Sequence, residues 1–364
     1  MPISAVETIT LAFQHTKKQL VGPFRFWQWT RLAVVGLLAG EMSSGGCNLP
    51  GGNYNFPQQS GGTKHLLGQH LFEQDWPKID PAILGGLIAI LVISGFVFMI
   101  VMTYVSSVMR FILFDSVLAK ECHIRQGWGR RQGPGWKYFL WQLGYLLVIF
   151  GGMVVLLGIP AGIAFALGWF RAAGDHVLGL VLVGIIVFFL LFIFLVAAAV
   201  IQVLTKDFVV PQMALEDIGA MEGWRRLWPM MLAEKGGYAV YVLMKFVLAI
   251  GAGIVIGIVT LILALVAAIP TALLGIVAVL TGKSAGLTWN AGTITLAVIV
   301  GCILFAAFMY LIALISVPAI VFFPAYAIYF FAARYRVLSL ALYPPPAALD
   351  SGVSGSPLIP ETSG

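Results

Sequence analysis

The segment EDIGAMEGWRRLW, residues 216–228, concentrates polar chemistry between two strongly apolar runs of the chain. It carries three acids, two arginines and two tryptophans. Arg225 and Arg226 could clamp a phosphate or a carboxylate, because a planar guanidinium binds such groups through two parallel hydrogen bonds. Alternatively, the segment is an amphipathic helix at a membrane surface, with Trp224 and Trp228 at the interface. The remaining sequence favours the surface helix.

The local spacing within this segment also fits a surface helix. Asp217 is the expected N-cap, and Met221 shares a helical face with both tryptophans. Glu222 and Arg226 stand four residues apart in the favourable order for an ion pair. Such a helix needs no catalytic or ligand-binding role.

The sequence TGKS, residues 281–284, contains the residue types of a phosphate-binding loop. That loop also requires a glycine five residues before Gly282, and the chain has Val277 there. We therefore reject a nucleotide-binding site.

Four metal-ligating side chains fall within one stretch: His65, His70, Glu73 and Asp75. Their spacings scatter around a helix, whereas an HExxH-type site aligns its ligands on one face. We expect no metal site, no cofactor and no catalytic constellation.

Composition shows which elements carry these side chains. The chain has 364 residues, of which 60% are hydrophobic and only 10% are charged. Residues 82–109, 138–170 and 177–205 contain no Asp, Glu, Lys or Arg. Each run exceeds the roughly 20 residues that a helix needs to cross a bilayer. The sequence therefore predicts an all-α, multi-pass membrane protein.

Three further spans are expected. Phe24–Gly40 is a weaker first span, with Trp27 and Trp29 at its interfacial end. Residues 238–281 and 294–333 are about twice as long as one crossing, so each crosses once or twice. We expect 238–281 to break at Pro270 and 294–333 to form one long kinked span. The total is about six spans.

The positions of Lys and Arg predict the orientation of these spans. Residues 1–31 hold four of them, 110–137 hold six, 206–245 hold five and 334–336 hold two, out of 21. Six spans with both termini in the cytoplasm place all seventeen on the inner side of a bacterial cytoplasmic membrane. The net charge of +6 then reflects topology and contact with anionic lipid headgroups, and nucleic acid is not an expected partner.

Ionisable side chains are almost absent from the apolar runs. Lys245 is the one exception, one or two turns inside the run 238–281. We expect its stem to extend to the cytoplasmic surface, because long cationic side chains reach the interface in this way. Glycine pairs, Gly158 with Gly162 and Gly253 with Gly257, predict close helix packing.

The chain contains an approximate internal repeat. Residues 110–131 resemble 207–226 in pattern, and residues 5–18 form a fainter third copy, in which Ser4 and Glu7 predict a capping box. Each copy is read as an in-plane amphipathic helix before two spans. We expect three repeats, at 1–110 with an outer loop at 41–81, at 111–206 and at 207–336. A disordered cytoplasmic tail follows at 337–364.

The GWRR motif, the long apolar pairs and the ending YAIYFFAARYRVL (325–337) resemble a known group. The chain resembles bacterial six-helix membrane proteins grouped with the membrane domain fused to some glycerophosphoryl diester phosphodiesterases. No soluble segment is long enough for the catalytic domain of those fusions. The resemblance supplies no catalytic residues.

We therefore predict a non-enzymatic accessory or scaffold protein that binds lipid, another membrane protein or a second copy of itself. The alternative is a transporter for a lipid-like or neutral solute, in a cavity between the spans. The candidate contact residues are Trp128, Arg130, Arg131, Trp224, Arg225, Arg226, Trp228 and Lys245.

Overall fold

The computed structural model describes residues 4–22, 24–41, 81–169, 176–284 and 291–343. All regular elements in these ranges are helices, which confirms the all-α prediction. The helices are α1 (Ala5–Leu20), α2 (Phe26–Leu38), α3 (Pro81–Ala119), α4 (Ile124–Ala166), α5 (Val177–Leu204), the π-helix η1 (Thr205–Val209), α6 (Val210–Glu216), α7 (Ala220–Ala233), α8 (Lys235–Ser284), α9 (Ala291–Ala332) and α10 (Arg336–Leu342).

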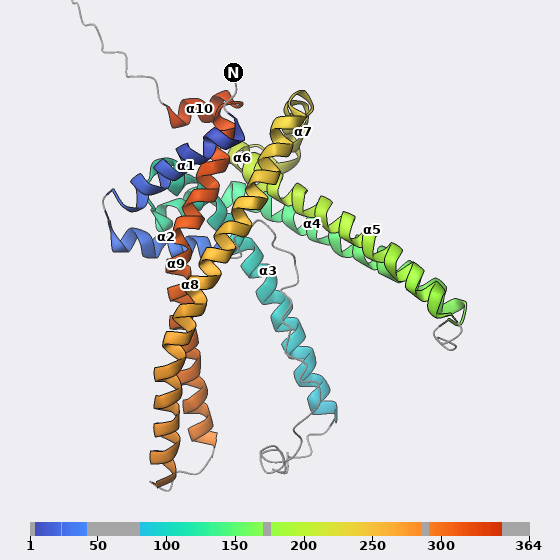
Figure 1. Ribbon diagram of the computed structural model, residues 1–364, viewed down its shortest axis with the longest axis vertical. Coiled ribbons are helices and arrows are strands. Elements are labelled where there is room, and N and C mark those ends of the chain that lie inside the picture. Colours follow the sequence, from blue (N-terminus) through green and yellow to red (C-terminus); the bar gives the residue numbers. More distant parts are fainter. Residues whose placement is uncertain (1–3, 23, 42–80, 170–175, 285–290, 344–364) are drawn as a thin grey trace, which may run out of the picture.

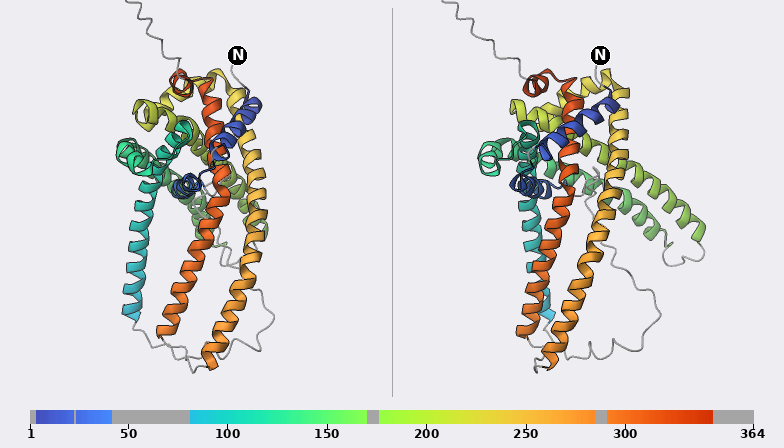
Figure 2. Two further views of the ribbon diagram at one scale, coloured as in Figure 1. Left: turned by 90° about the vertical axis from the view of Figure 1, so that its left-hand side faces the viewer. Right: turned by 60° about the vertical axis from the view of Figure 1, so that its left-hand side comes forward.

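The helices form a packed head from which long apolar helices extend (Figure 1). The head contains α1, α2, α6, α7 and α10, together with the adjoining ends of α3, α4, α8 and α9. From the head, α3, the α4–α5 pair and the α8–α9 pair extend away, and the α4–α5 pair diverges from the others (Figures 1 and 2). The N-terminal helix and α10 therefore lie at the same end of the molecule.

Five helical stretches are long and apolar enough to cross a membrane. They are Gly85–Ala119, Ile124–Ala166, Val177–Glu216, Lys235–Leu273 and Thr295–Ala332. Side chains outside the head are mostly exposed, as expected for surfaces that face hydrocarbon. These stretches indicate a multi-pass membrane protein.

The first predicted span is not confirmed as a crossing. Helix α2 covers most of Phe24–Gly40 but has 13 residues. At 1.5 Å per residue it is about 20 Å long, which is short of the roughly 30 Å of a bilayer core. Four of its residues, including Leu32 and Val35, are buried within the head.

Each of the two longest apolar runs forms one continuous helix. Helix α8 has 50 residues and passes through Pro270, so the predicted break there is wrong. Helix α9 has 42 residues and contains Pro318 and Pro324, as expected for a single long span. Neither run folds back to cross twice.

Aromatic side chains from distant helices fill the core of the head. Phe208 of η1 lies 5.0 Å from Tyr241 of α8 and 5.1 Å from Phe331 of α9, measured between ring centroids. Tyr241 in turn stacks on Tyr326 of α9 at 5.0 Å. Large aromatic surfaces contribute much of the hydrophobic stabilisation of a core. This core holds η1 and α8 against α9.

Two turns of the head contain non-glycine residues with positive φ. Lys120 ends α3 with a φ of 59°, and Asp217 ends α6 with a φ of 53°. Asp217 is thus the C-cap of α6, and Gly219 is the N-cap of α7, so the predicted N-cap was wrong. The predicted capping box of Ser4 with Glu7 is confirmed.

The second copy of the predicted in-plane helix is not a separate element. Residues 110–119 continue α3, and residues from Ile124 onward already belong to α4. The copy at residues 207–226 is likewise divided, between η1, α6 and α7.

The predicted disordered tail begins too early at residue 337. Arg336–Leu342 form α10, and Leu338 is fully buried. Residues 344–364 of that tail lie outside the described ranges.

The predicted glycine contacts are absent from the described part of the chain. No heavy atom lies within 4 Å of a Cβ built on Gly158, Gly162, Gly253 or Gly257, apart from the helix itself. These glycines lie on the extended helices, where little protein packs around them.

Candidate functional site

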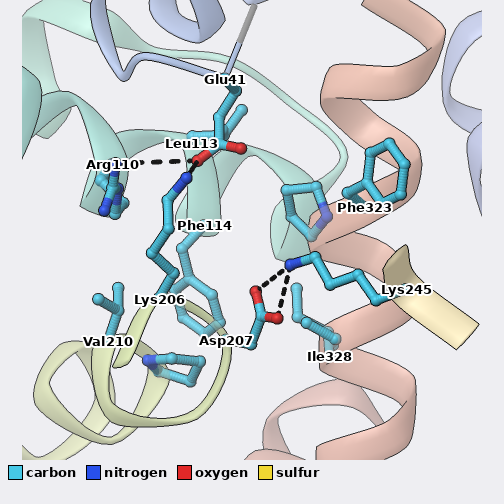
Figure 3. A pocket seen from close by; sticks show the side chains of 13 residues that line it. Glu41, Arg110, Leu113, Phe114, Lys206, Asp207, Val210, Lys245, Phe323 and Ile328 are labelled. Carbon is cyan, nitrogen blue, oxygen red and sulfur yellow. Dashed lines mark hydrogen bonds and ion pairs between the residues drawn. The ribbon is translucent and has the colours of Figure 1, made fainter. Parts of the chain in front are cut away.

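Five ionisable side chains gather inside the head, although they come from four separate segments (Figure 3). Glu41 follows α2, Arg110 belongs to α3, Lys206 and Asp207 belong to η1, and Lys245 belongs to α8. We call these five residues the charge cluster.

Two short ion pairs organise the charge cluster. The Lys245 ammonium lies 2.7 Å and 2.6 Å from the two carboxylate oxygens of Asp207. The Tyr241 hydroxyl donates to the same carboxylate at 2.9 Å. The Lys206 ammonium lies 2.7 Å from Glu41. Each carboxylate thus has its own lysine.

Arg110 makes its closest contacts with neutral groups. Its guanidinium donates to the Tyr138 hydroxyl and, at 3.0 Å, to the carbonyl of Ala39. The nearest carboxylate oxygen belongs to Glu41 and lies 3.9 Å away. Arg110 is only 6% exposed, so its charge is held inside the protein.

The π-helix places neighbouring residues in different ion pairs. Lys206 and Asp207 are adjacent in the chain, yet one contacts Glu41 and the other contacts Lys245. A π-turn accommodates an extra residue in a helix and often occurs at functional sites. Pro211 lies in the first turn of α6, just after the π-helix. Proline has no backbone N–H, so one hydrogen-bond donor fewer needs a partner there.

The cluster lies at the level where the apolar runs of its helices end. The charge-free run 82–109 ends immediately before Arg110, and 177–205 ends immediately before Lys206. Lys245 precedes a charge-free run that continues along α8. The cluster therefore lies where these charge-free runs meet the head.

The two nearest cations control the ionisation of Glu41. Burial alone would raise the pKa of this carboxyl group. The Lys206 ammonium and the Arg110 guanidinium outweigh that effect and lower the pKa to about 2. Glu41 is therefore a carboxylate at every physiological pH.

A small cavity of about 40 Å³ lies within the charge cluster. The five charged residues line it together with apolar walls from α3, α6 and α9, including Phe114, Val210 and Phe323 (Figure 3). Few water molecules fit in this volume, and the apolar part of its lining offers them no hydrogen bonds. The arrangement can hold a small ionic group.

A larger apolar groove runs between α5 and α8, beneath α7. Its volume is about 760 Å³, and its lining includes Val196, Trp228 and Phe246. Lys235 and Lys245 are the two charged residues in this lining. Trp228 and Phe246 are 56% and 50% exposed, so the groove is open along its side. We call this surface the α5–α8 groove.

The segment 216–228 is part of the head. The Trp224 indole donates to the Thr205 hydroxyl at 3.1 Å. Arg226 pairs with Glu222 at 3.0 Å, as predicted from their spacing, and also with Glu216. Arg225 is 80% exposed and pairs with Glu222 at 2.9 Å. Both arginines thus have acidic partners within their own segment.

The corresponding residues of the other predicted copy are placed differently. Arg131 is held by two bonds of 2.7 Å to the Asp115 carboxylate. The Trp128 ring packs edge-on against Tyr104, with 6.3 Å between the centroids. Arg130 is exposed. The candidate contact residues therefore do not form one site.

Lys245 does not extend to the surface. It is 8% exposed and is bound to Asp207 inside the head. The surface interpretation of this lysine was wrong because the sequence does not show that Asp207 lies opposite it. Each cluster cation marks the end of a charge-free run, which is the signal that could have grouped them.

No group of three or more His, Cys, Asp or Glu side chains suited to a metal occurs among the residues that the structure describes. His65, His70, Glu73 and Asp75 lie outside those residues.

Comparison with known proteins gives one match. Residues 3–341 match the model of a family of unknown function (DUF7544). No curated protein and no solved structure matches the chain. Because the match covers most of its length, the chain belongs to this family of unknown function.

Proposed function

We propose that the protein is a non-enzymatic accessory or scaffold protein that binds a membrane phospholipid in the α5–α8 groove. The observation that carries this proposal is the shape and polarity of the groove. Its walls are apolar along α5 and α8, and Lys235 lies at the head end. An acyl chain fits such walls, and a lysine near the surface attracts an anionic headgroup by about 1 kcal/mol.

The position of Trp228 supports the same occupant. It lines the groove, is more than half exposed and belongs to the short helix α7 at the head. Tryptophan favours the interface between headgroups and hydrocarbon. The groove would therefore begin at the headgroup level and continue into the hydrocarbon layer.

The experiment measures the lipid that stays bound after purification in a mild detergent. We expect native mass spectrometry to show retained phospholipid, and Val196→Trp to reduce it several-fold by filling the groove. Leu190→Trp is the matched control, because Leu190 lies on α5, is 50% exposed and is not part of the groove. Equal lipid retention in the two variants would contradict the proposal.

The surrounding membrane is proposed to be the bacterial cytoplasmic membrane, with the head on the cytoplasmic side. The clustering of Lys and Arg supports this orientation, since most of them lie at the head end of the spans. A reporter active only in the periplasm should be silent after residue 125 or 220 and active after 287. Activity after residue 220 would reverse the orientation.

We also propose that the α3–α4 and α6–α7 connections are copies of one unit. The same sequence interval separates Lys120 from Asp217 and Ile112 from Val209. Both members of the first pair have positive φ. A Cβ on Gly127 would lie 3.1 Å from Ile112, and one on Gly223 would lie 2.7 Å from Val209. Equivalent contacts at equivalent positions support a repeat.

The resemblance to the phosphodiesterase-linked membrane domains stays a prediction.

A transporter remains the alternative function, and the charge cluster is the observation that favours it. Ionisable side chains within membrane segments often mark the path of a substrate or an ion. Asp207 and Lys245 are such residues, and they adjoin a π-helix. Transfer of a labelled lipid or neutral solute across the bilayer of reconstituted vesicles, abolished by Asp207→Asn, would favour this alternative.

A further inference from the structure

The charge cluster contains more positive than negative charge. Arg110, Lys206 and Lys245 are cationic, while Glu41 and Asp207 are the two carboxylates of the cluster. The close Lys206–Glu41 and Lys245–Asp207 pairs occupy both carboxylates. Arg110 is therefore the cation in excess.

Glu41 neutralises Arg110 only in part, because its carboxylate lies 3.9 Å from the guanidinium and is already paired with Lys206 at 2.7 Å. Its short hydrogen bonds go to the neutral groups of Tyr138 and Ala39. Its Nε atom is buried and has no hydrogen-bond partner among the residues that the structure describes. A guanidinium does not lose its proton in a protein, and a buried charge that shares one carboxylate with a second cation is incompletely compensated. An anion beside Arg110 would remove this cost.

We infer that the cavity of the charge cluster binds one small monoanion, no larger than a phosphate group. Arg110, Lys206 and Lys245 line the cavity, and their cationic groups would surround this anion. A single negative charge brings the five-residue cluster to neutrality. Chloride, inorganic phosphate and the phosphodiester of a lipid share this chemistry.

The size and the walls of the cavity fit such an anion. A volume of about 40 Å³ has room for roughly three water molecules, which admits chloride with water or one phosphate group. Leu113, Phe114 and Phe323 form apolar walls. Apolar walls lower the effective dielectric constant and so strengthen the attraction between an anion and the three cations.

This site is distinct from the proposed lipid function. Lys245 lines both the cavity and the α5–α8 groove, but the excess charge belongs to Arg110, which does not line the groove. Loss of lipid from the groove in Val196→Trp would leave the anion site intact. The two proposals can therefore fail separately.

The test measures the melting temperature of the full chain, delipidated in a maltoside detergent, with gluconate as the only anion. Chloride or inorganic phosphate then replaces gluconate at constant ionic strength, and phosphatidylglycerol is added in a separate arm. Above the Kd, a ligand that binds only the folded state should raise the melting temperature by about 2 °C per tenfold increase in its concentration. A response to chloride or phosphate identifies a free anion, and a response to phosphatidylglycerol alone identifies a lipid.

Arg110→Gln should abolish this response, because it removes the excess charge and the unpaired Nε. Arg131→Gln is the matched control, since Arg131 is an arginine of the head that Asp115 already neutralises. It should lower the melting temperature and keep the response. The inference is overturned if none of the three probes acts, or if both variants lose the response equally.

Glu41→Gln keeps the test decisive if Arg110→Gln does not fold. This change removes a competing carboxylate and leaves Lys206 without its partner. The Kd for the anion should then fall by at least about tenfold, which is the effect of one nearby like charge at a partly buried site. Crystals grown in bromide should also show an anomalous scattering peak between Arg110, Lys206 and Lys245. An unchanged Kd together with no peak there would refute the site.

Discussion

Replacing Lys245 with methionine should destabilise the protein much more than the loss of a surface lysine would. Lys245 and Asp207 are 8% and 6% exposed, and the ammonium contacts both carboxylate oxygens at less than 2.8 Å. Methionine fills the space of the lysine stem but leaves the Asp207 charge with one phenolic hydrogen bond, from Tyr241. Removing one partner of a buried ion pair costs about 3–5 kcal/mol.

The double variant Lys245→Met, Asp207→Leu separates the loss of the pair from the cost of the orphaned carboxylate. It contains no buried charge at this position, so much of the lost stability should return. The remaining cost is about 1 kcal/mol, because the Tyr241 hydroxyl loses its acceptor. The two changes should thus compensate each other by at least about 2 kcal/mol.

The assay is reversible unfolding in mixed micelles of dodecyl maltoside and sodium dodecyl sulfate, followed by tryptophan fluorescence. The free energies of unfolding of both single variants, the double variant and the original protein complete the cycle. A cost below about 1 kcal/mol for Lys245→Met, the range of exposed ion pairs, would refute the reasoning. Lys245 would then behave as a surface residue.

Gly223→Ala should lower the free energy of unfolding by about 1–3 kcal/mol, because the new Cβ would lie 2.7 Å from the buried and stiff Val209 side chain. Gly129→Ala is the control: no atom lies within 4 Å of its new Cβ, so the free energy of unfolding should stay unchanged or rise. Burial lowers the pKa of His15, so its neutral form is favoured in the folded state. The stability that neutral His15 contributes should be complete above pH 6.5 and decline as the pH falls below 6.5. His15→Gln should therefore show a smaller decline in melting temperature between pH 7 and pH 5 than the original protein. The cations around Glu41 keep its pKa at about 2, so the stability that its charge contributes should persist down to about pH 4.5 and be lost between pH 4.5 and 2. Glu41→Gln should remove the fall in melting temperature that this loss causes.

Much of the helical architecture could be predicted from the sequence because a bilayer imposes simple rules. Runs without charge must be helical in hydrocarbon, since each backbone polar group needs a partner within its own segment. This rule located α3, α4, α5, α8 and α9. It did not distinguish a span from a short buried helix, and α2 was therefore assigned a full crossing.

The charge cluster could be predicted only in part. Arg110, Lys206 and Lys245 each mark the end of a charge-free run, and the sequence shows this directly. Their convergence depends on the π-turn at Thr205–Val209 and on the return of α2 toward α3, which no local pattern encodes. Asp217 illustrates the same limit, because an aspartate before a helix resembles an N-cap until its backbone is known to be left-handed.

The docking of α1 on α9 has a consequence for the order of events during synthesis. The His15 side chain contacts the Tyr329 hydroxyl at 3.1 Å, and the Tyr326 hydroxyl donates to the carbonyl of Ala5. These partners of α1 in α9 are thus made more than 300 residues after it. At roughly 5–20 residues per second, a ribosome needs about 15–60 s to make that length of chain. During this interval the apolar face of α1 has no α9 to cover it, so an emerging chain must hold this helix against the membrane surface or a chaperone until translation is nearly complete.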